Sequence, residues 1–322
     1  MLKRYDVLCI GSAVVDHFLT IQERMEDVRL GDKILVKHVE VHSGGGATNS
    51  AAALSKLGLK VKMLTKMGQD KEADFIVKEM KSYHVKNISL HHSKKATDFS
   101  TLINSSKEKD RIIYAYKGSS NDLTIRDFKK SQLKARWIYL ASLMGKSLQT
   151  AKEIAKFARE KRINLLFNPS LYLAEKGKTF LREILKATTI LVLNKEEAQA
   201  LLKSKSSDYK VLLLKLQELG PEIVVITNGA KELYAYHQGE IYSALPPNVK
   251  VVHSAGSGDS FTSGLLAGMI KKYSFEDSLR LGLVNSISVI QHIGTKNKLL
   301  TEKEAKELMN KYKIKVKKIQ VK

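Results

Sequence analysis

Short apolar runs alternate with helical patterns along most of this chain, and this alternation limits the folds that it can adopt. Each run is followed by turn or polar residues and, in most cases, by a stretch with helical spacing. The runs lie at residues 7–10, 61–65, 137–140, 165–168, 190–193 and 223–227. Strands that recur with a helix between them are typical of a parallel sheet covered by helices. We therefore predict an α/β fold with a mostly parallel central sheet.

Polar and glycine residues come directly after several of these predicted strands. Ligands of an open parallel sheet gather where the strands end at their carboxyl edge. The segments that we expect together at this rim are Gly11-Ser12, Asn168-Pro169, Asn194 and Thr227-Asn228-Gly229.

Two segments interrupt the alternation, at residues 18–41 and 97–116. Each combines alternating apolar residues with a polar turn, which is typical of an antiparallel hairpin. We expect the two hairpins to meet as a small sheet over the rim, as a lid that excludes water. The predicted core comprises residues 1–16, 44–95 and 118–322, and the predicted lid segments are 17–43 and 96–117. The tail from residue 311 is expected to add a last edge strand.

The 322 residues carry a formal net charge of +22, which raises the prospect of a polyanionic partner. The lysines are spread along the chain among glutamates, so we interpret the charge mainly as a solvated basic surface. A non-catalytic nucleic-acid-binding protein is a distant alternative. No apolar run approaches the roughly 18 residues that span a bilayer, and the N-terminus has no signal-peptide pattern. With a single cysteine, Cys9, the sequence predicts a cytoplasmic protein without an internal disulfide.

The segment 253–264 reads HSAGSGDSFTSG and is the strongest candidate for a chemical site. It follows a predicted strand at 249–252 and leads into an apolar helix at 261–270. Small residues here let backbone N–H groups face an anion at a helix N-terminus. These residues are Ala255, Gly256, Ser257 and Gly258. A carboxylate at the same turn, Asp259, can accept the proton of an attacking hydroxyl, which favours phosphoryl transfer; the alternative is that Asp259 caps the helix.

A second glycine-rich segment, residues 43–49, reads SGGGATN and opens a predicted helix at 47–57. It is not a Walker P-loop, because no Gly-Lys-Ser/Thr follows, and it is not a dinucleotide fingerprint. Its glycines could bind phosphate or let the backbone approach a polyhydroxylated ligand, with Asn49 donating and accepting hydrogen bonds. A plain tight turn is the remaining alternative.

Together, the two segments resemble the two signatures of the ribokinase-like (PfkB) carbohydrate kinases, a Gly-Gly segment leading to an Asn and a late Gly-x-Gly-Asp. The resemblance covers nearly the whole chain. It implies a ribokinase-like three-layer α/β/α sandwich, with a small β lid that often also forms a dimer interface. It further implies ATP and Mg2+ as cofactors, with Asp259 as the catalytic base beside an anion hole. The residues of that anion hole are Ala255, Gly256, Ser257 and Gly258.

On the substrate side, Gly11-Ser12 with Asp16 resembles the sugar-binding turn of this family, in which a carboxylate holds two vicinal hydroxyls. The resemblance places Gly44, Gly45 and Asn49 beside that turn, where they would position the acceptor.

On the nucleotide side, Asn194 and Glu197 resemble the Asn-x-x-Glu of the family. This match places Asn194 near the nucleotide phosphates and Glu197 in the network that orients magnesium. Thr227 and Gly229 match the Thr-x-Gly of the nucleotide site, and Asn285 lies on the helix that usually flanks adenine. The nucleotide-binding residues implied are Asn194, Thr227, Gly229, Ala255, Gly256, Gly258 and Asn285.

The chain departs from the family at three places. The late motif usually begins Asp-Thr-Thr, where this chain has His253-Ser254-Ala255. The missing carboxylate and hydroxyl often help to hold a monovalent cation, so the departure argues against activation by K+; His253 is a simple replacement or a neighbour of the phosphates. Gly46 stands where ribokinases typically carry Lys, and no acidic residue lies near Leu143-Met144, so a specific ribose assignment is weakened.

The leading hypothesis is an ATP-dependent kinase that phosphorylates a hydroxymethyl group of a sugar or related small polyol. The alternative is a nucleoside kinase of the adenosine, inosine or cytidine type, which needs an aromatic surface to stack a base. Phe18, Phe99 and Tyr114 are the candidates for that surface. The resemblance also implies a homodimer through the lid. The sequence leaves open the acceptor, ATP or ADP as donor, and the oligomeric state.

Overall fold

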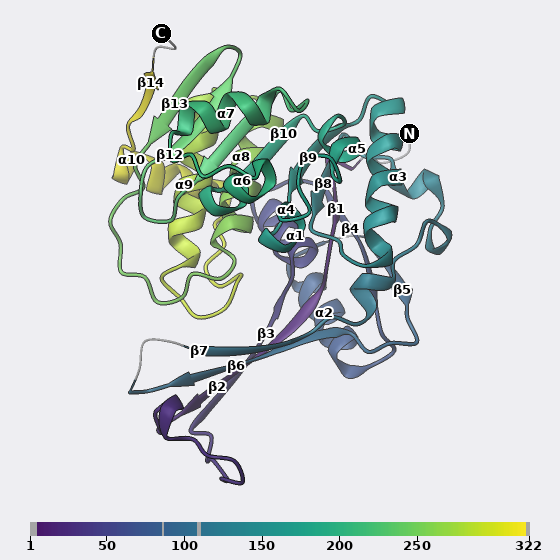
Figure 1. The fold of residues 1–322 in the computed structure, drawn as a ribbon, viewed down its shortest axis with the longest axis vertical. Coiled ribbons are helices and arrows are strands. Elements are labelled where there is room, and N and C mark those ends of the chain that lie inside the picture. The colour runs from purple at the N-terminus through teal and green to yellow at the C-terminus, as the bar shows by residue number, and fades with distance from the viewer. Residues whose placement is uncertain (1–4, 86, 108–110, 320–322) are drawn as a thin grey trace.

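The computed structural model describes residues 5–85, 87–107 and 111–319, which form a large sheet flanked by helices and a small separate sheet (Figure 1). Among the described residues the large sheet has ten strands in the order β14-β13-β12-β11-β10-β9-β8-β1-β4-β5. Neighbours from β5 to β11 run parallel, and β12, β13 and β14 are antiparallel. The strands are β1 Val7–Ile10, β4 Val61–Met67, β5 Asn87–His92, β8 Trp137–Ala141, β9 Asn164–Asn168, β10 Ile190–Asn194, β11 Ile223–Thr227, β12 Leu233–His237, β13 Glu240–Ala244 and β14 Val316–Ile319. The prediction of a mostly parallel sheet is confirmed.

Helices cover both faces of this sheet because its central strands are apolar on both sides. In β1, Val7 and Cys9 enter one core, whereas Leu8 and Ile10 enter the other. The first core is closed by α1 Gly46–Lys56, α2 Lys71–Ser82, α8 Ser257–Ile270, α9 Phe275–Val289 and α10 Glu302–Tyr312. The second is closed by α3 Lys146–Glu160, α4 Leu171–Ala174, α5 Arg182–Leu185, α6 Lys195–Leu202 and α7 Tyr209–Gln217. The three-layer α/β/α sandwich is therefore confirmed.

The predicted hairpins meet in one small sheet, which projects from the core in Figure 1. Its order is β3-β2-β6-β7, with β2 and β6 parallel at its centre. The strands are β2 Val14–Ile21, β3 His38–Gly44, β6 Asp98–Ser105 and β7 Arg111–Tyr116. Since β2 begins at Val14, it crosses the expected boundary between residues 16 and 17, and the division into core and lid segments stays a prediction. Part of the second predicted turn, residues 108–110, lies outside the described residues.

Two other predictions about single strands had different outcomes. The tail adds an antiparallel edge strand, β14, as predicted, although residues 320–322 lie outside the described part. The strand predicted at 249–252 is wrong. Its backbone is tied to the end of a helix, because the N–H groups of Val252 and His253 both donate to the carbonyl of Ile290. Val251 and Val252, which suggested a buried strand, are 54% and 48% exposed.

A carboxylate at the base of the lid ties it to the core. Asp70 caps α2 by accepting from the N–H of Ala73 at 3.0 Å. It also accepts from the N–H and the hydroxyl of Thr97, at 2.7 and 2.6 Å. Because Thr97 immediately precedes β6, these bonds set where the second lid hairpin leaves the core. Short 3-10 helices complete the described chain at Met25–Asp27, Ser119–Asp122, Ile125–Asp127 and Lys130–Leu133. No helix among the described residues has the length and apolarity to cross a membrane.

Candidate active site

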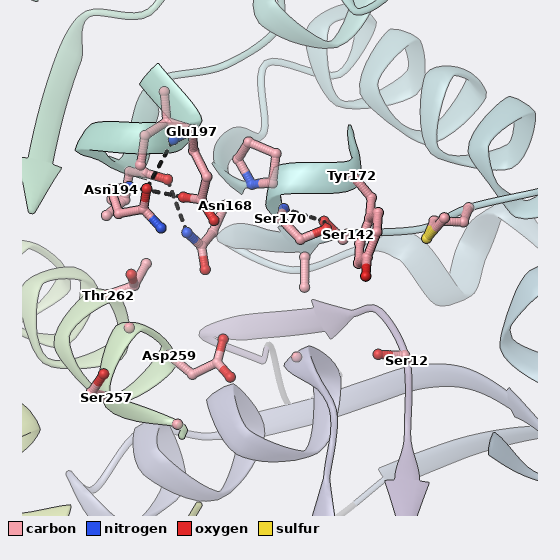
Figure 2. A pocket seen from close by; sticks show the side chains of 18 of the residues that line it. Ser12, Ser142, Asn168, Ser170, Tyr172, Asn194, Glu197, Ser257, Asp259 and Thr262 are labelled. Atoms are coloured by element: carbon pink, nitrogen blue, oxygen red, sulfur yellow. Dashed lines mark hydrogen bonds between the residues drawn. The ribbon is translucent and has the colours of Figure 1, made fainter. Parts of the chain in front are cut away.

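A cavity of about 450 Å³ opens at the carboxyl ends of the parallel strands, opposite the start of α8 (Figure 2). Residues that follow or end successive strands line it, as the rim prediction required. They are Ser12 after β1, Ser142 after β8, Asn168 and Pro169 at the end of β9, Asn194 at the end of β10, and Thr227 at the end of β11. Gly229 lies beyond this lining, in the turn that leads to β12.

The start of α8 forms the wall opposite these strand ends. Gly256 is the N-cap residue and has a left-handed φ of 79°. A Cβ at this position would lie 2.5 Å from the carbonyl oxygen of Thr295, so only glycine fits. Ser257, Gly258 and Asp259 follow in the first helical turn and line the cavity. The N–H of Ser257 makes a long bond of 3.3 Å to the carbonyl of Ser254. The N–H groups of a first turn have no helical carbonyl one turn back, so this wall presents donors and a positive dipole to an anion.

Asp259 projects from this wall into the cavity (Figure 2). Its Oδ2 accepts a hydrogen bond of 2.8 Å from Nδ2 of Asn49 on α1. The alternative in which Asp259 caps the helix is wrong, because Gly256 holds the cap position and the carboxylate is bonded to α1. Burial raises the pKa of the Asp259 carboxyl above its ordinary value, while the bond from Asn49, the charge of Lys296 and a bond from Tyr139 lower it.

Asn194 and Glu197 face Asp259 across the cavity (Figure 2). The Asn194 side chain accepts from the N–H of Glu197 at 2.8 Å, and the Glu197 carboxylate accepts from the N–H of Asn194 at 2.8 Å. This reciprocal capping box holds both side chains at the start of α6. Burial raises the pKa of Glu197 to about 7. The hydrogen bond from the N–H of Asn194 lowers this pKa, and the charge of Asp259 raises it.

The predicted acceptor residues form a group at the junction of lid and core. Asp16 on β2 accepts from the hydroxyl of Ser100 on β6. A Cβ at Gly44 would lie 2.2 Å from Oδ2 of Asp16, so this glycine lets the carboxylate approach the backbone. Gly45 has a φ of 98° and begins the turn into α1. Among these, Asn49 is the residue bonded to Asp259, which connects the group to the cavity.

The structure contradicts the expectation for Asn285. The residue is fully buried on α9. Its side chain donates to the carbonyl of Ser260 at 2.8 Å and accepts from the N–H of Leu300 at 3.4 Å. Because the buried amide is already bonded to α8 and to the segment before α10, it is not available to a ligand. Asn285 therefore holds two parts of the core together and does not line the cavity.

The aromatic residues proposed to stack a base also lie elsewhere. Phe18 is buried against His253 and His42, with ring centroids 5.2 and 5.6 Å apart. Phe99 stacks on Tyr116. Because Asp16 pairs with Ser100, its neighbour Phe99 lies on the opposite face of the lid sheet. Tyr114 lies on that same face.

Residues outside the predicted site complete it. Lys117, Met144 and Tyr172 line the cavity, and Thr295 and Lys296 lie behind Asn49. Lys117 ends the predicted lid segment 96–117, and Met144 lies where the sequence lacks the acidic residue of ribokinases. Tyr172, Thr295 and Lys296 belong to no glycine-rich motif and end no parallel strand, so no local pattern indicated them. Only the neighbouring Gly294, in an irregular segment, was a visible signal.

A model of the pfkB family of carbohydrate kinases matches residues 4–302. The chain belongs to the pfkB family of carbohydrate kinases. A curated relative of this PfkB kinase is the ribokinase of Mus musculus, 27% identical over 305 residues that cover 90% of each chain. The family resemblance stated from the two glycine motifs is thus confirmed.

Solved structures agree in fold. The ribokinase of Arabidopsis thaliana, complexed with ribose and ATP, superposes with a TM-score of 0.83 at 20% identity, covering 95% of this chain and 99% of that one. The nucleoside kinase of Methanocaldococcus jannaschii, a member of the ribokinase family, reaches 0.81 at 21% identity over 96% and 99%. At these identities the likeness establishes the ribokinase-like fold and leaves the acceptor to be argued from the site.

Proposed function

We propose that this PfkB kinase transfers the γ-phosphoryl group of ATP to a hydroxymethyl group of a sugar or related small polyol, with Asp259 as the base. The observation that carries the proposal is the position of Asp259. It stands at the N-terminus of α8, inside a cavity whose opposite wall is the row of strand ends that carries Asn194 and Thr227. A base beside an anion-binding helix end is what in-line phosphoryl transfer to a hydroxyl requires.

In this proposal the phosphates lie against the first turn of α8, and Asn194 and Thr227 bind the nucleotide. The acceptor lies toward Ser12 and Asp16, with its hydroxyl against Asp259. Asp259 takes the hydroxyl proton as the oxygen attacks the γ-phosphorus and the bond to the ADP oxygen breaks. The amides of Ser257 and Gly258 stabilise the charge on the equatorial oxygens.

The residues present fit a magnesium ion that is bound mainly through the nucleotide. Among the described residues there is no group of three or more His, Cys, Asp or Glu side chains that could hold a metal by itself. Mg2+ typically takes one or two protein carboxylates and keeps waters and phosphate oxygens as its other ligands. Glu197 is the carboxylate available opposite Asp259, and the ion would neutralise charge on the phosphates. Glu197 would hold the ion or its waters.

Glu197 leads to a pH prediction. Its pKa of about 7 means that the carboxylate ionises as pH rises through neutrality, so the Mg2+ concentration for half-maximal rate should fall several-fold between pH 6 and 8. In Glu197→Gln the Mg2+ concentration for half-maximal rate should lose this pH dependence. Only the pH dependence of Mg2+ binding to ATP itself should remain. Magnesium titrations at several pH values measure it. Glu218→Gln, at an exposed glutamate that is not among the groups acting on Glu197, is the control. Identical profiles for Glu197→Gln and the wild type would contradict the assignment.

A nucleoside acceptor is the second candidate, favoured by one observation. Tyr172 lies beside Ser142 at the cavity (Figure 2), which Met144 also lines, and Tyr172 is largely exposed. An aromatic ring at a pocket mouth can stack a base. The proposed lid aromatics give no such support, because Phe18 is buried and Phe99 faces away.

An ADP-release assay over pentoses, hexoses, phosphosugars and nucleosides, with and without K+, tests both candidates. We expect turnover with a sugar or polyol and equal rates without K+, because His253-Ser254-Ala255 lacks the family's usual carboxylate and hydroxyl. Turnover confined to nucleosides would favour the second candidate. No turnover with any acceptor, together with salt-dependent retention on DNA, would instead support a binding protein.

We also propose that the lid forms a homodimer through the face turned away from Asp16. Cross-strand pairing puts one row of residues on this face across all four strands. The row is Val39, Leu19, Ile103 and Ile112. Val41, Phe99, Tyr114 and Tyr116 extend it and are exposed. A second copy would cover this apolar face and pair one of its open edge strands.

Val39→Glu is expected to turn the dimer into a monomer, because it would bury a charge within that apolar interface. Light scattering after gel filtration measures the mass of wild type and variant. Leu245→Glu changes a comparably exposed apolar residue on the core and should leave the mass unchanged. A wild-type monomer at high micromolar concentration would refute the interface.

A further inference from the structure

Lys296 is a buried lysine directly behind the site. Its side chain is 3% exposed, in the irregular segment between α9 and α10. Its ammonium donates to the carbonyl of Ser43 and to Oδ1 of Asn49, the latter at 3.2 Å. It does not line the cavity, so it cannot act by touching a ligand there. Burying a charge at this depth costs free energy unless the charge is paired and hydrogen-bonded, so the partners of Lys296 matter.

The contacts of Lys296 decide which way the Asn49 amide points. Oδ1 of Asn49 faces two donors, the Lys296 ammonium at 3.2 Å and the Thr295 hydroxyl at 2.8 Å. Turning the amide over would set its NH2 group against the ammonium and its oxygen against the Asp259 carboxylate, so both contacts would become repulsive. Nδ2 therefore points at Asp259 and donates to the carboxylate at 2.8 Å.

The charge of Lys296 also acts on Asp259 directly. Among the causes that hold down the pKa of Asp259 against its burial, the Lys296 charge follows the Asn49 hydrogen bond. Tyr139 on β8 adds a hydrogen bond, and Asp259 in turn acts on Glu197 across the cavity and on Cys9 on β1. Lys296 is the cation among the groups that act on Asp259.

Acidic groups on three elements face Lys296 in turn. Glu79 on α2 lies 3.9 Å from its ammonium, and Asp16 and Asp259 lie within electrostatic reach. Tyr83, which follows α2, donates to the backbone carbonyl of Lys296 at 3.4 Å. Burial lowers the pKa of Lys296 to about 8, a fall that the three carboxylates limit, so the side chain is charged at neutral pH.

We propose that Lys296 is a positioning residue for Asp259: with Thr295 it orients the Asn49 amide, and its charge favours the ionised form of the Asp259 carboxylate. The inference rests on the proposed role of Asp259 as base, because an unprotonated carboxylate is what a base requires. It assigns to the Lys296 charge a part in catalysis that is exerted through Asn49 and through space.

The test compares Lys296→Met with Lys62→Met. Lys62 is also buried, at 7% exposed, and donates to the carbonyl of Gln132, but it is not among the groups that act on Asp259. In Lys296→Met we expect the acidic limb of kcat/KM to move upward by about one pH unit, a loss of about tenfold below that limb. Above pH 8, where wild-type Lys296 loses its proton, the two profiles should converge. Lys62→Met should keep the wild-type limb.

A second measurement does not depend on turnover. Carbon-13 NMR titration of the aspartate carboxyls, with Asp259→Asn to assign the signal, should show Asp259 protonating at higher pH in Lys296→Met. If that variant fails to fold because Glu79 is left unpaired, Lys296→Met with Glu79→Gln removes both charges and carries the same expectation. An unmoved Asp259 titration and an unmoved limb would overturn the inference, and so would an equal shift in Lys62→Met. A wild type without kinase activity would instead refute the proposed function.

Discussion

Replacing Asp259 by Asn is expected to lower kcat by roughly three orders of magnitude while ATP binding changes only a few-fold. The amide has the shape of the carboxyl group, and its oxygen can still accept the hydrogen bond from Asn49, so the site should keep its geometry. It cannot take up the proton of the attacking hydroxyl. Steady-state rates with the acceptor found in the screen, and calorimetric titration with ATP, separate these two effects.

Asp208→Asn is a matched control for this experiment. Asp208 caps α7, where Asn caps almost as well, so the variant should fold normally and keep its kcat. If Asp259→Asn turned over acceptor at a rate close to that of the wild type, Asp259 would not be the base. The first turn of α8 would then promote phosphoryl transfer only by stabilising the charge on the phosphate.

Gly256→Ala is expected to reduce kcat by about 100-fold or more, because the turn that aims the α8 amides can no longer form. The left-handed φ of 79° strains any side chain here, and a Cβ would lie 2.5 Å from the Thr295 carbonyl oxygen. The combined strain should lower the free energy of unfolding by about 2–4 kcal/mol. Urea denaturation gives the stability change, and kcat at saturating ATP gives the catalytic change.

Gly31→Ala separates the two sources of strain. Gly31 also has a positive φ, 91°, but a Cβ there meets no atom within 4 Å. We expect this variant to lose only about 1 kcal/mol, the cost of the backbone conformation. Equal stability losses in the two variants would mean that the clash with Thr295 is relieved by a small shift of the chain. Full activity of Gly256→Ala would show that the turn does not set the anion-binding geometry.

The glycine motifs and the strand ends could be predicted because both depend on local properties of the chain. The first turn of α8 follows from small residues before a helix, and Asp259 follows them directly. Parallel strands end at one edge, so Ser12 and Asn194 had to lie along it. The wrong predictions came from residues whose local character misled. Asn285 is polar, but its side chain makes its hydrogen bond inside the core. The segment 249–252 is rich in valine, but its backbone is hydrogen-bonded to the end of α9.

Neighbouring residues carry the hydrophobic period and the glycine placement, so the sequence alone could predict the mostly parallel sheet, the small lid sheet and the position of Asp259. Only the tertiary structure decided which side chains control that aspartate. Asn49 reaches Asp259 across 210 positions of the chain, and Lys296 reaches Asn49 across 247. No local pattern reports such contacts, because packing α1 against α8, with the segment after α9 behind them, creates this charged environment.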